Sequence, residues 1–327
     1  MNTLALSLVI PLYNEVENVE ALFSALENAL QGLEFEAILV DDGSLDGTAE
    51  ALDAGAQRLG SRYKVIHLQR NFGQTAAMQA GIDAAEGEII VTLDGDLQND
   101  PVDIPMLVKL LHERDMDVVA GWRKNRQDGL VLRKIPSRIA NWLIGSMTGV
   151  RLHDYGCTLK AYRANVLKPI RLYGEMHRFI PAWLATQTYT NRIIEVPVRH
   201  HPRVAGQSKY GISRTLRVVV DLLFVKFFMR FNQRPMHFFG AIGLLFLLLG
   251  TLMLSYLFML KLFTGADIGG RPMLIGGVLF VIAGFQWLST GLMGEMLSRV
   301  YYESQGKRSY VVRRVVNIDP DRTKCGI

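Results

Sequence analysis

The chain has 327 residues, 49% of them hydrophobic, which is enough for one large soluble domain and a smaller part. Its formal net charge of +5 at pH 7 is too small to indicate nucleic-acid binding, and it fits an anionic membrane surface better. The two cysteines, Cys157 and Cys325, cannot form a disulfide framework, so a disulfide-stapled fold is excluded and a reducing compartment is expected.

Short β-rich runs alternate with helical patterns as far as residue 120. The pattern predicts strands at 6–10, 37–40, 65–68, 88–93 and 117–120, and helices at 16–30, 48–59, 75–85 and 104–111. This order is typical of βαβ units, so we expect an α/β fold with a mostly parallel sheet and helices on both faces. The first strand is not followed by Gly-x-Gly-x-x-Gly, nor any strand by Gly-Lys-Ser/Thr, which argues against a dinucleotide fold and a P-loop.

Polar and glycine-rich segments follow four of these strands. They are Pro11–Glu15, Asp41–Ser44, Asn71–Gly73 and Asp94–Asp96. The carboxyl ends of parallel strands meet at one sheet edge, where open α/β sheets bind ligands, so one site built from four loops is expected. Two acids flanking a glycine can share Mg²⁺ or Mn²⁺, which keeps positions for water and phosphate. An isolated Asp-Gly-Asp would more often be an acidic turn, but the other three loops favour a metal–diphosphate site.

A basic segment follows the fifth strand. Its cations are Arg123, Lys124, Arg126, Arg133, Lys134 and Arg138, with Asp128 as the balancing acid. Such a run is usually a solvated face. Because the amphipathic stretch 135–147 comes next, we expect a phosphate cradle at lipid headgroups instead. The segment His153–Cys157 adds a third acid, Asp154; His153 is predicted to be structural, and Cys157, which lacks a paired base, to be a core residue.

Two uncharged apolar runs, 238–260 and 273–294, each have the roughly 20 residues that cross a bilayer as a helix. The short connection predicts a transmembrane hairpin, and the flanking arginines and lysines predict that both of its ends are cytoplasmic. The N-terminus lacks the basic region of a signal peptide. The segment 215–231 suits an interfacial helix or a helix within the soluble domain. The tail at 307–314 suits a strand or a headgroup contact.

The motifs together resemble a known family. They are Ile10–Glu15, Val40–Ser44, Arg70–Gly73, Asp94–Gln98, Arg203–Tyr210 and the C-terminal pair of apolar runs. Nearly end to end, the chain resembles a membrane-bound family 2 glycosyltransferase with the GT-A fold, from the polyprenyl-phosphate glycosyltransferase group. Gly95 stands where relatives often carry Ala, a change of one small residue for another.

The resemblance implies roles for individual residues. Asp96 would be the metal ligand for Mg²⁺ or Mn²⁺, with Asp94 close to the donor and Gln98 assisting the cation. Pro11, Tyr13, Glu15 and Asp42 match nucleotide-binding positions. Arg123 and Arg133 match acceptor-phosphate contacts, and Arg203, Ser208 and Lys209 match a loop that closes over both phosphates. Asp154 would be the catalytic carboxylate. Two roles stay open: Asp154 acts as a base, or it orients the acceptor and holds nearby cationic groups in place. The base is not required, because a phosphomonoester with a second pKa near 6 is already largely ionised.

The resemblance also implies a metal-dependent reaction, in which a sugar is transferred from a nucleotide-diphosphate sugar to undecaprenyl or another polyprenyl phosphate. The anomeric carbon would be inverted, and the nucleotide diphosphate would leave. The product would serve cell-envelope glycan or lipid A modification. The segments 125–128 and 154–157 resemble bacterial enzymes that use a UDP-linked formamido-arabinose, which favours UDP over GDP. The expected protein is a multi-pass homotetramer of the bacterial inner membrane with a cytoplasmic catalytic domain.

The expected parts are a GT-A domain at 1–212, a juxtamembrane amphipathic helix at 213–235, two membrane helices within 236–298 (about 236–260 and 273–297) and a cytoplasmic tail at 299–327. Two other functions stay open. A processive polysaccharide synthase would need more spans and a Gln-x-x-Arg-Trp motif, which Gln286-Trp287 does not supply. A non-catalytic scaffold or sugar-lipid transport subunit would be expected to lose the acids that are present here.

Overall fold

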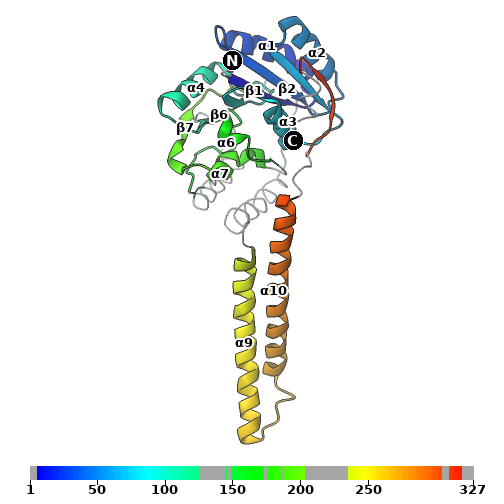
Figure 1. Cartoon of the computed structure of the whole chain (residues 1–327), viewed down its shortest axis with the longest axis vertical. Helices are drawn as coiled ribbons and strands as arrows, with labels where there is room; N and C mark the ends of the chain where they lie inside the picture. The colour runs from blue at the N-terminus through cyan, green and yellow to red at the C-terminus, as the bar shows by residue number, and fades with distance from the viewer. Residues whose placement is uncertain are drawn as a thin grey trace. The chain divides into compact units, whose positions relative to one another are not determined.

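The computed structural model describes residues 6–124, 145, 149–172, 176–185, 187–202, 235–303 and 309–318. The chain separates into two units. One comprises residues 1–222 together with 308–327, and the other comprises residues 223–307. Figure 1 shows the elements of both units in chain order, and each unit is described by itself below.

The first unit contains the sheet and its covering helices. Its elements are β1 (Leu6–Leu12), α1 (Val16–Ala29), β2 (Phe35–Asp41), α2 (Thr48–Leu59), β3 (Tyr63–Leu68), α3 (Gln74–Ala84), β4 (Ile89–Thr92), η1 (Pro101–Asp103), α4 (Ile104–Glu113), β5 (Val118–Trp122), β6 (Lys160–Arg163), α6 (Ala164–Leu167), η3 (Met176–Arg178), α7 (Ile180–Leu184), η4 (Thr190–Arg192), β7 (Ile193–Pro197) and β8 (Val312–Val316). The predicted βαβ order up to residue 120 is confirmed, and α2 has the predicted bounds.

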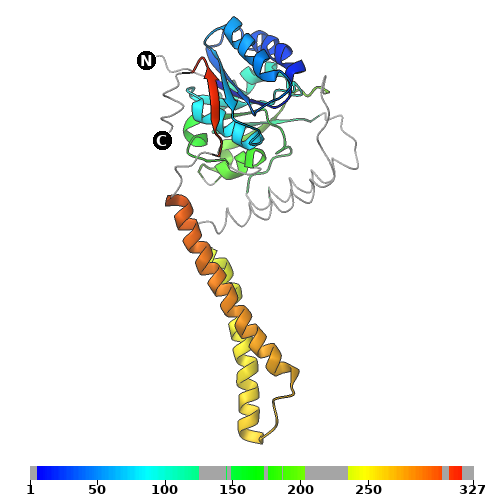
Figure 2. The ribbon, with the colours of Figure 1, turned by 90° about the vertical axis from the view of Figure 1, so that its right-hand side faces the viewer.

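The described strands form one sheet in the order β7-β5-β6-β4-β1-β2-β3-β8. The strands β4, β1, β2 and β3 are parallel neighbours, with Leu6 opposite Phe35 in β2 and opposite Ile89 in β4. Strand β6 runs antiparallel between β4 and β5, and β7 is parallel to β5. Strand β8 pairs antiparallel with β3, which resolves the question of the tail in favour of a strand. Figure 2 shows β8 in red along the edge of the sheet.

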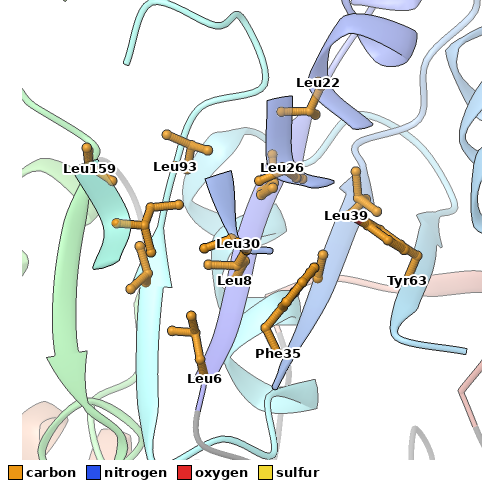
Figure 3. Packing of buried hydrophobic residues seen from close by; sticks show 14 of the residues in the cluster. Leu6, Leu8, Leu22, Leu26, Leu30, Phe35, Leu39, Tyr63, Leu93 and Leu159 are labelled. Atoms are coloured by element: carbon orange, nitrogen blue, oxygen red, sulfur yellow. The ribbon is translucent and has the colours of Figure 1, made fainter. Parts of the chain in front are cut away.

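The main core lies between the sheet and the helices α1, α2 and α4. Alternate residues of β1 face it, because successive strand side chains point to opposite sides. Figure 3 shows Leu22 and Leu26 of α1 directed at the strands that carry Leu8 and Leu39. All four side chains are fully buried. Truncating one of them to Ala would cost about 2–5 kcal/mol of stability, so this layer fixes the strands whose ends form the site.

Helix α3 packs on β1, β2 and β3, and its residues Thr75 to Ile82 are buried. A Cβ at Gly81 would lie 2.4 Å from a methyl carbon of Val9, so this position requires glycine for the close approach of helix and strand. Because α3 follows directly on the Asn71–Gly73 loop, its packing holds the N-terminal end of the helix at the carboxyl edge of the sheet.

The second unit consists of α9 (Pro235–Thr264) and α10 (Pro272–Glu303), which lie side by side as a hairpin in Figure 1. The stretches Phe239–Thr264 and Pro272–Gly294, of 26 and 23 residues, are long and apolar enough to cross a membrane. Most of their large apolar side chains are exposed, among them Leu248, Phe258 and Phe285. This exposure is what a lipid-facing pair requires, and it differs from a buried core helix. The pair is therefore compatible with membrane association.

Candidate functional site

The loop after β4 carries Asp94 and Asp96. The Asp94 carboxylate is half-buried and accepts a 2.7 Å hydrogen bond from Nε2 of Gln74, the first residue of α3. Asp96 is buried, and its Oδ1 accepts a hydrogen bond from the backbone N–H of Gln98 at 3.1 Å. Burial and then the negative charge of Asp96 raise the pKa of Asp94 to about 6. The structure therefore brings two interacting carboxylates to the sheet edge.

The loop after β2 is joined to the loop after β3 through Asp42. The Asp42 carboxylate accepts hydrogen bonds from the backbone N–H groups of Phe72 and Gly73, at 2.7 and 2.9 Å. Burial raises the pKa of Asp42, and these two bonds oppose that effect. Gly43 has φ +70°, and a Cβ there would lie 2.5 Å from the backbone carbon of Arg70, so only glycine allows the two loops to approach so closely.

The loop after β1 is joined to the β2 loop by paired hydrogen bonds. The backbone N–H of Asn14 donates to Oγ of Ser44, and the backbone N–H of Leu45 donates to Oδ1 of Asn14, both at 2.9 Å. Asp46 accepts a hydrogen bond from the backbone N–H of Thr48 at 3.1 Å, which closes the turn before α2.

The predicted nucleotide-binding residues of the β1 loop lie beside these contacts. Pro11 is buried in β1, Tyr13 is half-buried, and Glu15 accepts a 2.6 Å hydrogen bond from Nδ2 of Asn18. The four predicted loops thus lie at one edge of the sheet, and the β1, β2 and β3 loops are directly hydrogen-bonded to one another.

Arg123 and Asp154 form a bidentate ion pair. The Nε and Nη2 groups of Arg123 donate to the two carboxylate oxygens of Asp154 at 2.7 and 2.9 Å, and both side chains are largely buried. Burial alone would lower the pKa of Arg123, but the hydrogen bonds and charge of Asp154 raise it. The predicted acceptor-phosphate contact and the predicted catalytic carboxylate are therefore direct partners.

Glu195 of β7 holds the segment that carries Asp154. Its carboxylate accepts hydrogen bonds from the backbone N–H groups of His153 and Asp154, at 2.9 and 2.8 Å, and lies 2.8 Å from Nδ1 of His153. The His153 ring also stacks on Trp122, with 4.5 Å between ring centroids, which supports its predicted structural role. Sequence reasoning missed Glu195, because no strand is predicted around it and its partners lie far away in the chain.

Lys160 is a second residue that sequence reasoning missed. It is 1% exposed, and its Nζ donates to the backbone oxygens of Tyr155 and Cys157. Burial lowers the pKa of Lys160 and raises the pKa of the Cys157 thiol to about 11. Cys157 is fully buried, as its predicted place in the core requires. Gln74 is the third missed residue; its position at the first turn of a helix that starts at the sheet edge is the signal that would have found it.

The carboxylate pair fits a hard divalent cation. Among the residues that the structure describes, no group of three or more His, Cys, Asp or Glu side chains is arranged to hold a metal on its own. Burial is the main cause of the raised pKa of Asp94, and repulsion from Asp96 adds to it; a cation between the two carboxylates would relieve that repulsion. Carboxylate oxygens are the ligands that Mg²⁺ and Mn²⁺ prefer, and such ions take further ligands from phosphate and water. The donor set is therefore suited to a metal bound together with a diphosphate.

Several predicted residues lie outside the described part of the chain. They are Arg133, Arg203, Ser208 and Lys209, together with the helix predicted at 213–235 and most of the stretch 135–147.

The model of glycosyl transferase family 2 matches residues 7–171, half of the chain, and spans all four loops as well as Arg123 and Asp154. Two kinds of curated relative match nearly its whole length. A dodecaprenyl-phosphate galacturonate synthase of Rhizobium johnstonii is 52% identical over 96% of this chain and 94% of its own. An undecaprenyl-phosphate 4-deoxy-4-formamido-L-arabinose transferase of Pseudomonas syringae is 37% identical over 95% of this chain and 90% of its own.

Solved structures resemble the first unit in fold. The glucosyl-3-phosphoglycerate synthase of Mycobacterium tuberculosis, crystallised with Mn²⁺, UDP and glucosyl-3-phosphoglycerate, superposes with a TM-score of 0.53 at 18% identity. The match covers 68% of this chain and 79% of that chain. The same synthase with Mn²⁺ and UDP-glucose gives a TM-score of 0.53 and covers 68% and 78% of the two chains. The predicted GT-A fold is confirmed.

Proposed function

Because the chain belongs to glycosyl transferase family 2, we propose that it transfers a sugar from a nucleotide-diphosphate sugar to a polyprenyl phosphate. Its activity as a glycosyltransferase follows from the family and from two kinds of relative whose names specify polyprenyl-phosphate products. The observation that carries the proposal is that Asp94, Asp96 and Arg123 follow strands that end at the same edge of the sheet, because β4 and β5 both run antiparallel to β6. Asp154 joins them as the direct partner of Arg123.

We assign the nucleotide diphosphate to the loops after β1, β2 and β4. Pro11, Tyr13, Glu15 and Asp42 would contact the nucleoside, with UDP favoured over GDP. Asp96, assisted by Gln98, would hold a divalent cation, which would stabilise the charge that grows on the leaving diphosphate. The Mn²⁺ and UDP in the Mycobacterium tuberculosis neighbour support both assignments.

We assign the acceptor phosphate to the cationic side of the site. Arg123 uses Nε and Nη2 for Asp154, so Nη1 is the group that would reach the phosphate, together with Arg133. Arg203, Ser208 and Lys209 would close over the two phosphates. A phosphate oxygen would attack the anomeric carbon directly and invert it. Most of the rate would come from holding two anions together and offsetting their repulsion.

The role of Asp154 follows from its partner. Both of its carboxylate oxygens accept hydrogen bonds from Arg123, and an acceptor phosphate with a second pKa near 6 needs no strong base. Asp154 would therefore act mainly by orienting Arg123 towards the acceptor. This is the second of the two roles that the sequence left open.

We rank the proposed donor sugars by the sequence identity of the relatives that are named for them. Galacturonate comes first because the galacturonate synthase is 52% identical, and formamido-arabinose comes second because its transferases are 37% identical.

We further propose that α9 and α10 anchor the enzyme in the bacterial inner membrane, with the sheet in the cytoplasm, and that it assembles as a homotetramer.

The proposal is tested by incubating the detergent-solubilised full chain with undecaprenyl phosphate and radiolabelled UDP- and GDP-sugars, with and without EDTA. Lipid labelling that EDTA abolishes is expected, strongest with UDP-galacturonate. If a donor is consumed but the lipid is not labelled, the assignment as a glycosyltransferase would stand. The assignment of polyprenyl phosphate as the acceptor would then be wrong. A processive synthase would instead give a labelled polymer.

A further inference from the structure

A buried histidine outside the proposed site joins two carboxylates. His67, near the end of β3, has its Nδ1 at 2.9 Å from Oδ2 of Asp41 and its Nε2 at 2.8 Å from Oδ1 of Asp53. The side chains of His67 and Asp41 are only 3% and 4% exposed. Each ring nitrogen thus lies within hydrogen-bond distance of a different carboxylate. The imidazole ring is therefore fixed between the end of β2 and helix α2.

One end of this chain of contacts reaches the nucleotide loop. The other carboxylate oxygen of Asp41, Oδ1, accepts a 2.9 Å hydrogen bond from the backbone N–H of Ser44. Burial by itself would raise the pKa of Asp41, but the bonds from His67 and Ser44 lower it, so the carboxylate stays ionised. Ser44 in turn accepts from the backbone N–H of Asn14. Asp41 thus holds the turn that contains Asp42 and connects it to the β1 loop.

The other end reaches the strand that follows the long helices. The second oxygen of Asp53 lies 2.5 Å from Nη1 of Arg314 on β8. Arg314 stands directly opposite His67 in the antiparallel pairing of β3 and β8. The continuous series is Arg314, Asp53, His67, Asp41 and Ser44. A residue of the C-terminal tail is therefore connected through side chains to the loop after β2.

The ordering of charge in this series matters for its rigidity. Cationic Arg314 and the imidazole alternate with two carboxylates, so each polar atom named above faces a partner of complementary character. Buried networks in which every member is satisfied hold a unique geometry, whereas removal of one member releases its neighbours. Removing the Arg314 guanidinium frees one oxygen of Asp53, and with it the carboxylate that orients His67.

We propose that His67 and Arg314 are positioning residues for the nucleotide, through which strand β8 holds the Asp41–Ser44 turn in its nucleotide-binding conformation. The inference rests on the proposed function in one respect, because that function assigns the turn to the nucleotide. It adds that nucleotide affinity depends on a tail strand on the far side of β3, while the acceptor side, built on β5 and the Asp154 segment, does not depend on it.

The test compares full-length variants in detergent. Arg314→Gln removes the charge, Arg314→Lys keeps it, and Arg58→Gln is the matched control. Arg58 lies on α2, as Asp53 does, and forms an exposed ion pair with Glu20. We expect UDP binding, measured by titration calorimetry, to weaken about three- to tenfold in Arg314→Gln and to recover in Arg314→Lys. The control should bind UDP as the parent does.

Steady-state kinetics separate positioning from a merely structural role. Arg314→Gln should raise KM for the donor while KM for polyprenyl phosphate and kcat at saturating donor stay unchanged, and His67→Asn should show the same split. Unchanged donor KM, or equal losses toward donor and acceptor, would overturn the inference and leave the proposed function standing. If the unaltered protein bound neither UDP nor GDP, the proposed function itself would fall, and the inference with it.

Discussion

Arg123 and Asp154 hold each other through two hydrogen bonds, from Nε to Oδ2 at 2.7 Å and from Nη2 to Oδ1 at 2.9 Å. The backbone N–H of Asp154 is itself bound to Glu195 of β7. A guanidinium that follows β5 is thus fixed by a segment anchored on the neighbouring strand. This geometry fixes the orientation of the Arg123 guanidinium.

The bidentate pair predicts that Arg123→Lys is not a conservative change, because an ammonium cannot reproduce the planar fork of the guanidinium. We expect kcat/KM for polyprenyl phosphate to fall about tenfold or more, equivalent to about 1.4 kcal/mol of transition-state stabilisation. The control is Arg62→Lys, which alters an exposed pair in which Nη2 alone donates to both carboxylate oxygens of Glu27, and it should leave kcat/KM unchanged. Equal activity of both variants would contradict the assignment of Arg123 to the acceptor side.

Asp96→Ala should abolish turnover, with a loss of at least about a hundredfold, because it removes the proposed metal ligand. Its apparent unfolding temperature should stay close to that of the parent, since the carboxylate lies in a loop at the sheet edge. Glu113→Ala, at an exposed acid of α4 that pairs with Lys109, serves as the control. Near-normal turnover in Asp96→Ala, measured by lipid labelling, would rule out the metal assignment.

Gln74 is expected to position Asp94, because its Nε2 donates to the Asp94 carboxylate at 2.7 Å. Gln74→Ala should lower kcat about tenfold through misplacement of that carboxylate. Gln74→Glu should lower kcat further, since its carboxylate would repel Asp94, which Asp96 already repels. Gln57→Ala, at an exposed position of α2, is the matched control. If both Gln74 variants had the same kcat as Gln57→Ala, Gln74 would not be a positioning residue for Asp94.

Acid sensitivity is expected from Asp41, whose pKa lies below the ordinary value of 3.8 because hydrogen bonds from His67 and Ser44 outweigh burial. A carboxyl whose folded pKa is depressed contributes stability that is present above its unfolded pKa and lost as the pH falls through the folded value. Asp41→Asn should therefore lower the apparent unfolding temperature at pH 7. This difference from the parent should narrow below about pH 4. A pH-independent difference would show that the ionised form is not the stabilising one.

The hairpin should depend on glycine at its helix contact. A Cβ at Gly250 would lie 2.8 Å from the carbonyl oxygen of Gly277 in α10, so α9 and α10 approach closely there. Gly250→Leu should destabilise the detergent-solubilised protein by about 1–3 kcal/mol through overpacking. Gly270→Ala, where a Cβ meets nothing within 4 Å, is the control, and thermal unfolding of both variants is the measurement.

Regular periodicity made the first part of the fold predictable. Helix α2 begins at Thr48 and ends at Leu59 as expected, and β1 to β5 lie where the apolar runs predict them. Strands β6 and β7 were not predicted. With four and five residues they are short, and β6 contains Lys160 and Arg163, so its strand form depends on pairing with β4 and β5 rather than on local pattern.

The residues of the site also fall into two groups, those whose place could be predicted from the sequence and those whose place could not. Residues that follow strands, such as Asp42, Asp94 and Asp96, were found because chain order alone brings them to one edge. The residues that hold the surrounding segments were not found. Glu195 and His67 acquire their roles through contacts with segments far away in the chain, and the burial of Lys160 cannot be seen in the sequence. No local sequence signal shows which carboxylate a buried His67 will meet.

Strand β8 has a consequence for the order in which the protein is made. It follows α10 in the chain, so the sheet receives this edge strand only after both apolar helices have been synthesised. Chain segments that emerge earlier from the ribosome fold without it, since domains form as their residues become available. If β8 strengthens donor binding as proposed, a nascent chain binds the donor more weakly until its hairpin has been made. Synthesis itself would then delay full donor affinity until both apolar helices are present.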